Sequence, residues 1–148
     1  MNSVLVKLHH WLRRNGKYRV LLVDDEPGIL ATLGAILELH DFQVITASSA
    51  EGANQLLQTK HFDLVITDMK MESDQAGYNV VEAARHSSGN PPTLIISGCP
   101  ALAEDWEEHG AAAMLTKPTP VPELFAVVNR LLEHPITPKA SEVRIEAA

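Results

Sequence analysis

The sequence has a single cysteine, no long apolar run and no excess of positive charge, and each of these absences excludes a class of protein. Because Cys99 is the only cysteine among 148 residues, no internal disulfide can form, and the chain suits a reducing compartment such as the cytoplasm. No apolar stretch approaches the roughly 20 residues of a membrane-spanning helix. Lys7 and Arg13 interrupt the apolar N-terminal residues, so we expect no secretory signal. A net charge of −7 argues against direct binding of nucleic acid.

Short apolar runs alternate with amphipathic segments through most of the chain. Alternating strands and helices predict a parallel sheet with right-handed crossovers. Five such units fit an α/β, flavodoxin-like (βα)5 doubly wound sheet with strand order 2-1-3-4-5. We expect strands at about 18–24, 43–47, 62–68, 93–97 and 112–116, and helices at about 27–40, 50–60, 77–87, 101–109 and 121–133.

Two segments, residues 1–17 and 135–148, fall outside the alternating unit of residues 18–134. The first is predicted to be an additional amphipathic helix. We favour packing of its apolar face on the domain, or self-association, over contact with a membrane. Residues 135–148 contain two prolines and little apolar periodicity, which predicts a flexible tail. The apolar face of the first segment consists of Val4, Leu5, Leu8, Trp11 and Leu12.

Three carboxylates and one lysine come directly after predicted buried strands. Asp24 and Asp25 follow the first strand, Asp68 follows the third, and Lys117 follows the fifth. In an open parallel sheet the functional site lies at the carboxyl ends of the strands, and this strand order makes the first and third strands neighbours. Carboxylates that meet there repel one another, and a hard divalent ion such as Mg²⁺ suits their oxygen atoms. The pattern predicts a phosphoryl-transfer site that uses no P-loop.

Taken together, these motifs resemble the receiver domain of response regulators in two-component signalling, of the CheY-like kind, over roughly residues 18–134. The segments LLVDDEP, LVITDMKM, LIISG and LTKP occur in this order with helix-sized gaps. The resemblance implies that Asp68 is the phosphoacceptor, modified by a histidine kinase or phosphotransfer protein. It also implies a Mg²⁺ site made by Asp24, Asp25, Asp68 and the backbone carbonyl of Lys70, in which Asp25 binds the ion directly and Asp24 acts mostly through water.

The resemblance implies further roles for residues around this site. Lys117 would pair with the acidic residues and then with the phosphoryl oxygens, and Ser97 would turn inward to donate a hydrogen bond to the phosphoryl group. Pro118 would follow a cis peptide bond. Lys70 and Cys99 would flank the path of the hydrolytic water, so we expect them to set the lifetime of the aspartyl phosphate.

The sequence departs from the family pattern at three places. Met114 occupies a commonly aromatic position that rotates inward on activation, so conformational coupling is expected to be altered. The loop after Asp68 commonly reads Met-Pro and then Asp-Gly, whereas residues 71–77 lack the proline and run one residue longer. Gly98 stands where alanine is more usual, which leaves room and loosens that loop.

Three hypotheses for function remain open at this point. The first is a stand-alone receiver, a switch rather than an enzyme, whose 93–97 and 112–116 face binds a downstream protein or forms a homodimer. About fifteen residues follow the last helix, which we expect to be too few for an output domain. The second is a degenerate receiver that acts as a phosphorylation-independent interaction or dimerisation module. The third, a haloacid-dehalogenase-like hydrolase, ranks low because Lys70 stands where those enzymes place a second aspartate.

Overall fold

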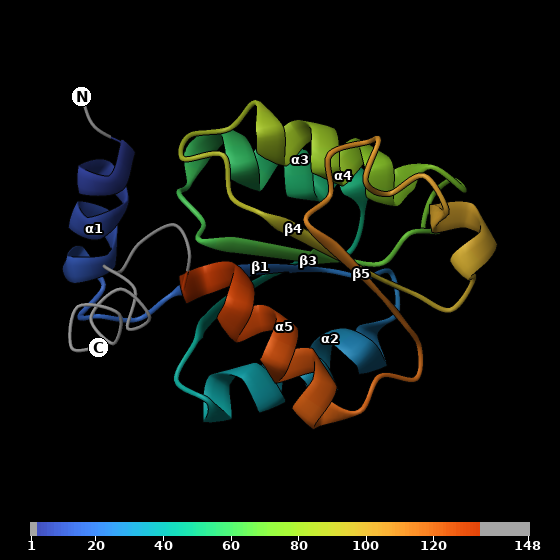
Figure 1. The fold of residues 1–148 in the computed structure, drawn as a ribbon, viewed down its shortest axis with the longest axis horizontal. Coiled ribbons are helices and arrows are strands. Elements are labelled where there is room, and N and C mark those ends of the chain that lie inside the picture. Colours follow the sequence, from blue (N-terminus) through green and yellow to red (C-terminus); the bar gives the residue numbers. More distant parts are fainter. Residues whose placement is uncertain (1–2, 134–148) are drawn as a thin grey trace, which may run out of the picture.

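In a computed structural model, which describes residues 3–133, a parallel sheet lies between two layers of helices (Figure 1). Its order β2-β1-β3-β4-β5 confirms the predicted flavodoxin-like topology. The expected tail at 135–148 lies outside the described residues. The strands are β1 (Arg19–Val23), β2 (Gln43–Ala47), β3 (Leu64–Thr67), β4 (Thr93–Ser97) and β5 (Ala113–Thr116). The α-helices are α1 (Ser3–Arg13), α2 (Pro27–Leu39), α3 (Ala50–Thr59), α4 (Ala76–Arg85) and α5 (Val121–Glu133).

The central strands β1 and β3 are buried on both faces, which explains why their sequences are continuous apolar runs. Successive side chains of a strand point to opposite faces of the sheet. Leu22 therefore packs in the cluster with α2 and α5, and Leu21 packs in the cluster with α3 and α4. Val23 lies opposite Thr67 in the β1–β3 register, so the residues that follow these two strands emerge side by side.

The predicted helix at 101–109 is wrong as an α-helix. A short 3-10 helix, η1 (Pro100–Ala103), is followed by turns as far as Gly110. Four carboxylates crowd the second half of this segment, where they repel one another and oppose the negative end of a helix dipole. A ring contact to α4 holds the segment instead, because Tyr78 stacks on His109 with 3.7 Å between ring centroids. The four carboxylates belong to Glu104, Asp105, Glu107 and Glu108.

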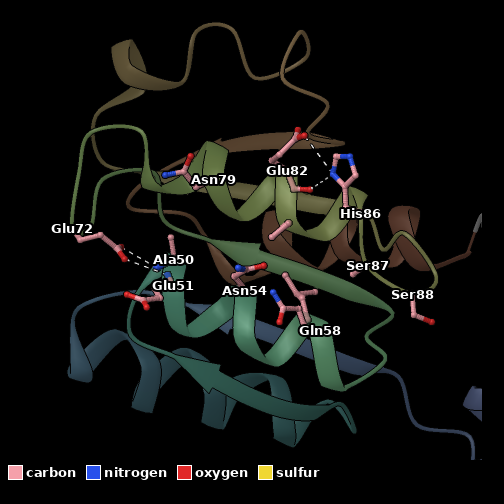
Figure 2. Close-up of a pocket in the computed structure, with 12 residues that line it drawn as sticks. Ala50, Glu51, Asn54, Gln58, Glu72, Asn79, Glu82, His86, Ser87 and Ser88 are labelled. Carbon is pink, nitrogen blue, oxygen red and sulfur yellow. Dashed lines mark hydrogen bonds and ion pairs between the residues drawn. The ribbon is translucent and has the colours of Figure 1, made fainter.

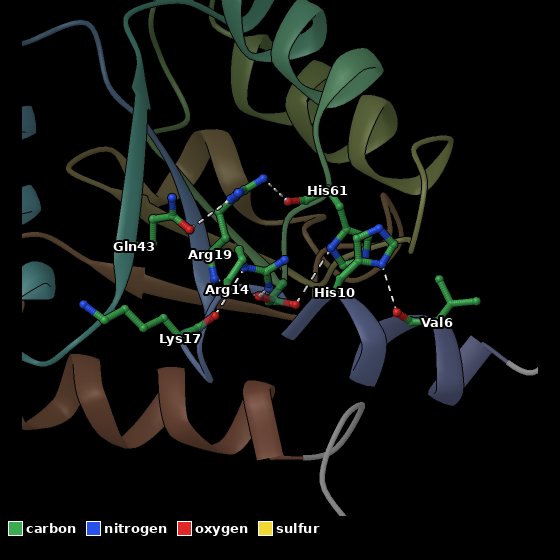
Figure 3. Close-up of polar contacts among 8 residues, drawn as sticks. Val6, His10, Arg14, Lys17, Arg19, Gln43 and His61 are labelled. Carbon is green, nitrogen blue, oxygen red and sulfur yellow. Dashed lines mark hydrogen bonds and ion pairs between the residues drawn. The ribbon is translucent and has the colours of Figure 1, made fainter. Parts of the chain in front are cut away.

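Helix α1 packs at the amino ends of β1 and β3, at the opposite end of the sheet from the predicted site (Figures 1 and 3). Arg14 forms an ion pair with Asp63, and both side chains are almost fully buried. The same Asp63 carboxylate accepts a hydrogen bond from the backbone N–H of Arg19 at 2.7 Å. His10 stacks on His61 with 4.0 Å between ring centroids. Polar and aromatic contacts therefore fix α1 to the domain.

The apolar face of α1 packs on the domain only in part, since Leu8 and Trp11 are half-buried, and self-association of that face stays a prediction. Leu5 and Leu12 are 59% and 58% exposed, because the side of α1 that carries His10 faces the domain, as does Arg14 in the turn directly after the helix. Among these apolar residues, only Trp11 packs beside an aromatic ring of the domain. Its ring centroid lies 6.1 Å from that of Tyr18. A buried ion pair outweighed the burial of two leucines here, because Asp63 needs a partner once it is removed from water. None of the helices within residues 3–133 is long and apolar enough to cross a membrane.

We predict that Arg14→Met lowers the free energy of unfolding by about 3 kcal/mol, because it leaves the Asp63 carboxylate buried without a counter-charge. Chemical denaturation followed by circular dichroism measures this change. Arg13→Met is the matched control, since Arg13 is exposed on the same helix, and it should change the unfolding free energy by less than about 0.5 kcal/mol. Equal effects of the two substitutions would show that the ion pair does not fix α1.

His61 is a second unusual group beneath α1. Its side chain is buried, and neither ring nitrogen has a hydrogen-bond partner among the described residues. Burial, followed by the positive charges of His10 and Arg14, lowers the pKa of His61 to about 4. An unfolded histidine binds a proton near pH 6.5 while the folded one stays neutral. The contribution of His61 to stability is therefore lost as pH falls from about 6.5 to about 4.

We predict that His61→Phe, which keeps a buried ring and removes the titrating group, makes stability less sensitive to acid. The difference in unfolding free energy between variant and wild type should shift in favour of the variant by on the order of 2 kcal/mol between pH 7 and pH 4.5. Urea denaturation at several pH values measures this difference. A difference that stays constant with pH would contradict the assignment of a neutral His61.

Candidate functional site

Three carboxylates gather where β1 and β3 end. Asp24 and Asp25 follow β1, and Asp68 follows β3, in adjacent parallel strands. One carboxylate oxygen from each residue lies within 4.8 Å of the others. Asp24 is buried, Asp68 is partly buried and Asp25 is exposed, so the group opens to solvent on one side. The structure thus brings together the three acidic residues that the sequence singled out.

Lys117, which follows β5, extends its ammonium group between two of these carboxylates. Its Nζ atom lies 3.0 Å from Oδ2 of Asp24 and 3.2 Å from Oδ2 of Asp68. The backbone N–H of Lys117 donates to the carbonyl of Ser97 at 2.9 Å, which ties the end of β5 to the end of β4. The Lys117–Pro118 peptide bond is cis, as predicted.

The protonation equilibria of the site reflect burial as well as charge. Burial raises the pKa of Asp68 above its usual value, and the nearby ammonium of Lys117 only partly offsets this effect. Burial lowers the pKa of Lys117, but its hydrogen bond to Asp24 and the charges of both carboxylates outweigh burial and raise that pKa overall. Ionisation of Asp68 is therefore less favourable than that of an aspartate in water.

The donor atoms at this site fit a divalent cation. Three carboxylates and one ammonium leave two negative charges uncompensated. Mg²⁺ prefers oxygen ligands and is commonly held by only one or two carboxylates, with water in its remaining positions. The carbonyls of Asp68 and Met69 already accept hydrogen bonds, whereas within residues 3–133 the carbonyl of Lys70 accepts none. That oxygen remains available as a further ligand.

The other predicted site residues lie around this group without contacting it through their side chains. Ser97 ends β4, and its Oγ accepts a hydrogen bond from the backbone N–H of Cys99 at 3.0 Å. Cys99 is exposed. The Lys70 ammonium lies 3.8 Å from Oδ1 of Asp74, with both side chains largely exposed. Met114 is partly buried in the cluster formed by β4, α4 and the segment after η1.

Two residues near Asp68 were not assigned a role from the sequence. A Cβ atom at Gly77 would lie 2.7 Å from the carbonyl oxygen of Asp68, so only glycine allows α4 to start this close to the site. The Glu72 carboxylate accepts hydrogen bonds from the backbone of α3 (Figure 2). A glycine at the start of a predicted helix could have signalled the first feature. A lone glutamate in a loop carries no comparable signal.

A separate groove of about 720 Å³ runs between α3 and α4 (Figure 2). It is lined by exposed carboxylate and amide side chains, including Glu51, Asn54 and Glu82, and by none of the three clustered aspartates. Polar side chains of this kind on helix surfaces are normally solvated. The clustered carboxylates, which are close together and partly desolvated, are the stronger candidate for chemistry.

Sequence comparison places these features among known proteins. Residues 20–129 match the family model described as "Response regulator receiver domain". The chain is 36% identical over 117 residues to the alginate biosynthesis transcriptional regulatory protein AlgB of Pseudomonas putida. The aligned region covers 78% of this chain. It spans only 26% of the length of that relative.

Solved structures agree with the sequence match. The chemotaxis response regulator CheY4 of Vibrio cholerae superposes with a TM-score of 0.70 at 28% identity, covering 78% of this chain and 99% of that one. The response regulator TrrA of Thermotoga maritima, in complex with Mg²⁺ and BeF, superposes with a TM-score of 0.70 at 27% identity and the same coverage.

We predict that Asp68→Asn stabilises the protein at neutral pH in the absence of divalent ions. The substitution removes one of three crowded carboxylates, and the effect should be on the order of 1 kcal/mol, a common scale for single substitutions. Because the folded pKa is raised, the penalty from ionised Asp68 is present at neutral pH and disappears as pH falls through the folded pKa and then the ordinary carboxyl value. Thermal unfolding with EDTA at pH 7 and pH 3.5 measures the gain, and a gain of equal size at both pH values would contradict the charge explanation.

Proposed function

The chain belongs to the response regulator receiver domain family, and on this basis we propose that Asp68 is its phosphoacceptor. Receiver domains are signalling switches rather than classical enzymes, and they are phosphorylated by histidine kinases and act on downstream partners. The observation that carries the proposal is the joint placement of Asp24, Asp25, Asp68 and the Lys117 ammonium at one end of the sheet.

The proposed step is transfer of a phosphoryl group from a phosphohistidine to Asp68. A carboxylate oxygen of Asp68 forms the new O–P bond while the N–P bond breaks, and the histidine nitrogen keeps the electron pair. The Lys117 ammonium, already 3.2 Å from Asp68, pairs with the phosphoryl oxygens as charge moves onto them. Burial of Asp68 removes water that would otherwise solvate the nucleophile.

Asp25, Asp68 and the backbone carbonyl of Lys70 would hold Mg²⁺ directly. Asp24, whose two carboxylate oxygens accept hydrogen bonds from the Glu26 N–H and the Lys117 ammonium, would act mostly through water. When bound, the ion would neutralise negative charge on the phosphoryl oxygens. Close spacing of the three carboxylates and the charge they leave uncompensated support this assignment. TrrA, a relative in fold and sequence, is known in complex with Mg²⁺ and BeF.

The proposed output is a change of the β4–β5 face. Ser97 would exchange its bond from the Cys99 N–H for one to the phosphoryl group, and Met114, in the adjacent cluster, would repack. The recipient would be a downstream protein or a second copy of the chain. Lys70 and Cys99 would influence how long the aspartyl phosphate survives.

Intact-mass spectrometry after incubation with acetyl phosphate and Mg²⁺ tests the proposal. We expect a single phosphoryl adduct that requires Mg²⁺ and is absent from Asp68→Asn. Asp74→Asn is the matched control, because it removes an exposed carboxylate from the same loop and should leave the adduct intact. Absence of any adduct from the wild-type protein, together with no binding of beryllofluoride, would instead indicate a phosphorylation-independent interaction module.

A further inference from the structure

Glu72 joins the loop after β3 to the start of α3, and we propose that it is a positioning residue for the metal ligand in that loop. Its Oε1 accepts a hydrogen bond from the backbone N–H of Ala50 at 2.9 Å, and its Oε2 accepts one from the N–H of Glu51 at 3.3 Å (Figure 2). The inference rests on the proposed function, because the ligand in question is the carbonyl of Lys70, two residues before Glu72.

The contact has a physical reason on the α3 side. The first N–H groups of an α-helix lack partners within the helix and carry partial positive charge, so a carboxylate stabilises them. Ser49 caps α3 by accepting from the N–H of Gly52, and Glu72 satisfies the two N–H groups that precede it. Three of the four free donors of α3 are thereby bonded, two of them by a residue from another segment.

On the loop side, this contact fixes the chain just beyond Lys70. Before Lys70, the carbonyl of Met69 accepts the N–H of Gly77 at 2.7 Å, and the Met69 side chain is fully buried. After Lys70, Met71 packs on the cluster under α3 and α4, and Glu72 adds the two directional bonds. The exposed Lys70–Asp74 ion pair at 3.8 Å adds little, since such pairs are weak in water.

The sequence explains why such an anchor is useful here. The related loop commonly carries proline after the methionine, and proline restricts the backbone by fixing φ. In this chain Glu72 follows Met71 at that place, and the loop lacks the fixed φ. Two hydrogen bonds to α3 take the place of that covalent restraint on the backbone just beyond Lys70.

An anchored ligand should bind the metal more tightly than a free one. Removing a group that orients a metal ligand commonly weakens binding by 10-fold or more. The coupling is reciprocal, so a bound ion should in turn protect the bonds between Glu72 and α3. Glu72 thus acts on the metal ion through the loop, without touching it.

Calorimetric titration with Mg²⁺ alone, without a phosphodonor, tests the inference on the full chain. We expect Glu72→Ala to weaken Mg²⁺ binding about 10-fold and Glu72→Gln, which keeps one acceptor oxygen, to weaken it less. Glu51→Ala removes a carboxylate from the same turn of α3 but not the tether, so it should bind Mg²⁺ like the wild type. Amide hydrogen exchange gives a second readout: Mg²⁺ should slow exchange at Ala50 and Glu51 in the wild type but not in Glu72→Ala.

The outcomes separate this inference from the function on which it rests. Equal Mg²⁺ affinity of Glu72→Ala and the wild type would overturn the role of Glu72 while leaving phosphorylation of Asp68 intact. Equal weakening by Glu51→Ala would also overturn it, because the cause would then be charge at α3 rather than the tether. A wild-type chain that binds no Mg²⁺ and forms no Mg²⁺-dependent adduct would overturn both proposals.

Discussion

Repulsion among three carboxylates at the ends of β1 and β3 is the constraint on which the rest of this structure depends. Apolar packing on both faces of these strands brings Asp24, Asp25 and Asp68 together, although their charges oppose it. Lys117 offsets part of the repulsion and leaves two negative charges. The fold therefore holds excess negative charge at the carboxyl ends of β1 and β3, and a bound cation would neutralise it. That excess charge also makes the site sensitive to any anion added there.

The acidic groups at the two ends of the sheet differ in how far their charge is compensated. At the amino ends, Asp63 is as buried as any group in the site, and Arg14 and the Arg19 N–H offset part of the cost of that burial. Burial still raises the pKa of Asp63 above its ordinary value, and its Oδ1 has no hydrogen-bond partner among the described residues. At the carboxyl ends one ammonium faces three carboxylates, so two negative charges remain uncompensated. The ion pair at the amino ends therefore serves stability, and the uncompensated charge at the carboxyl ends is available to bind a cation. Because these groups lie at different ends of the same strands, one can change without the other.

Most of the fold was predictable because buried strands and amphipathic helices leave direct periodic patterns; strands 43–47 and 93–97 match the structure to the residue. The acidic group was predictable because strand order alone makes β1 and β3 neighbours. The helix expected at 101–109 failed because apolar spacing does not register four crowded carboxylates. The contacts that hold α1 could not be predicted, because they depend on Asp63, which is 49 residues from Arg14 along the chain. The Glu72 contact, between segments about twenty residues apart, was hidden for the same reason.

Two of the three places where this chain departs from its family pattern lie outside the regular strands and α-helices, in the loop after Asp68 and in the segment after Ser97. The loop after Asp68 is held by Glu72 on α3, and the segment after Ser97 is held by the stacking of Tyr78 on His109. Elements held by a few side-chain contacts, rather than by a helical ladder, can rearrange without disturbing the core. Both lie beside the site: the first follows Asp68 directly, and the second follows Ser97 at the end of β4, the neighbour of β3. A change of charge there would therefore act first on these two segments, while β1 and β3 remain fixed by their apolar packing.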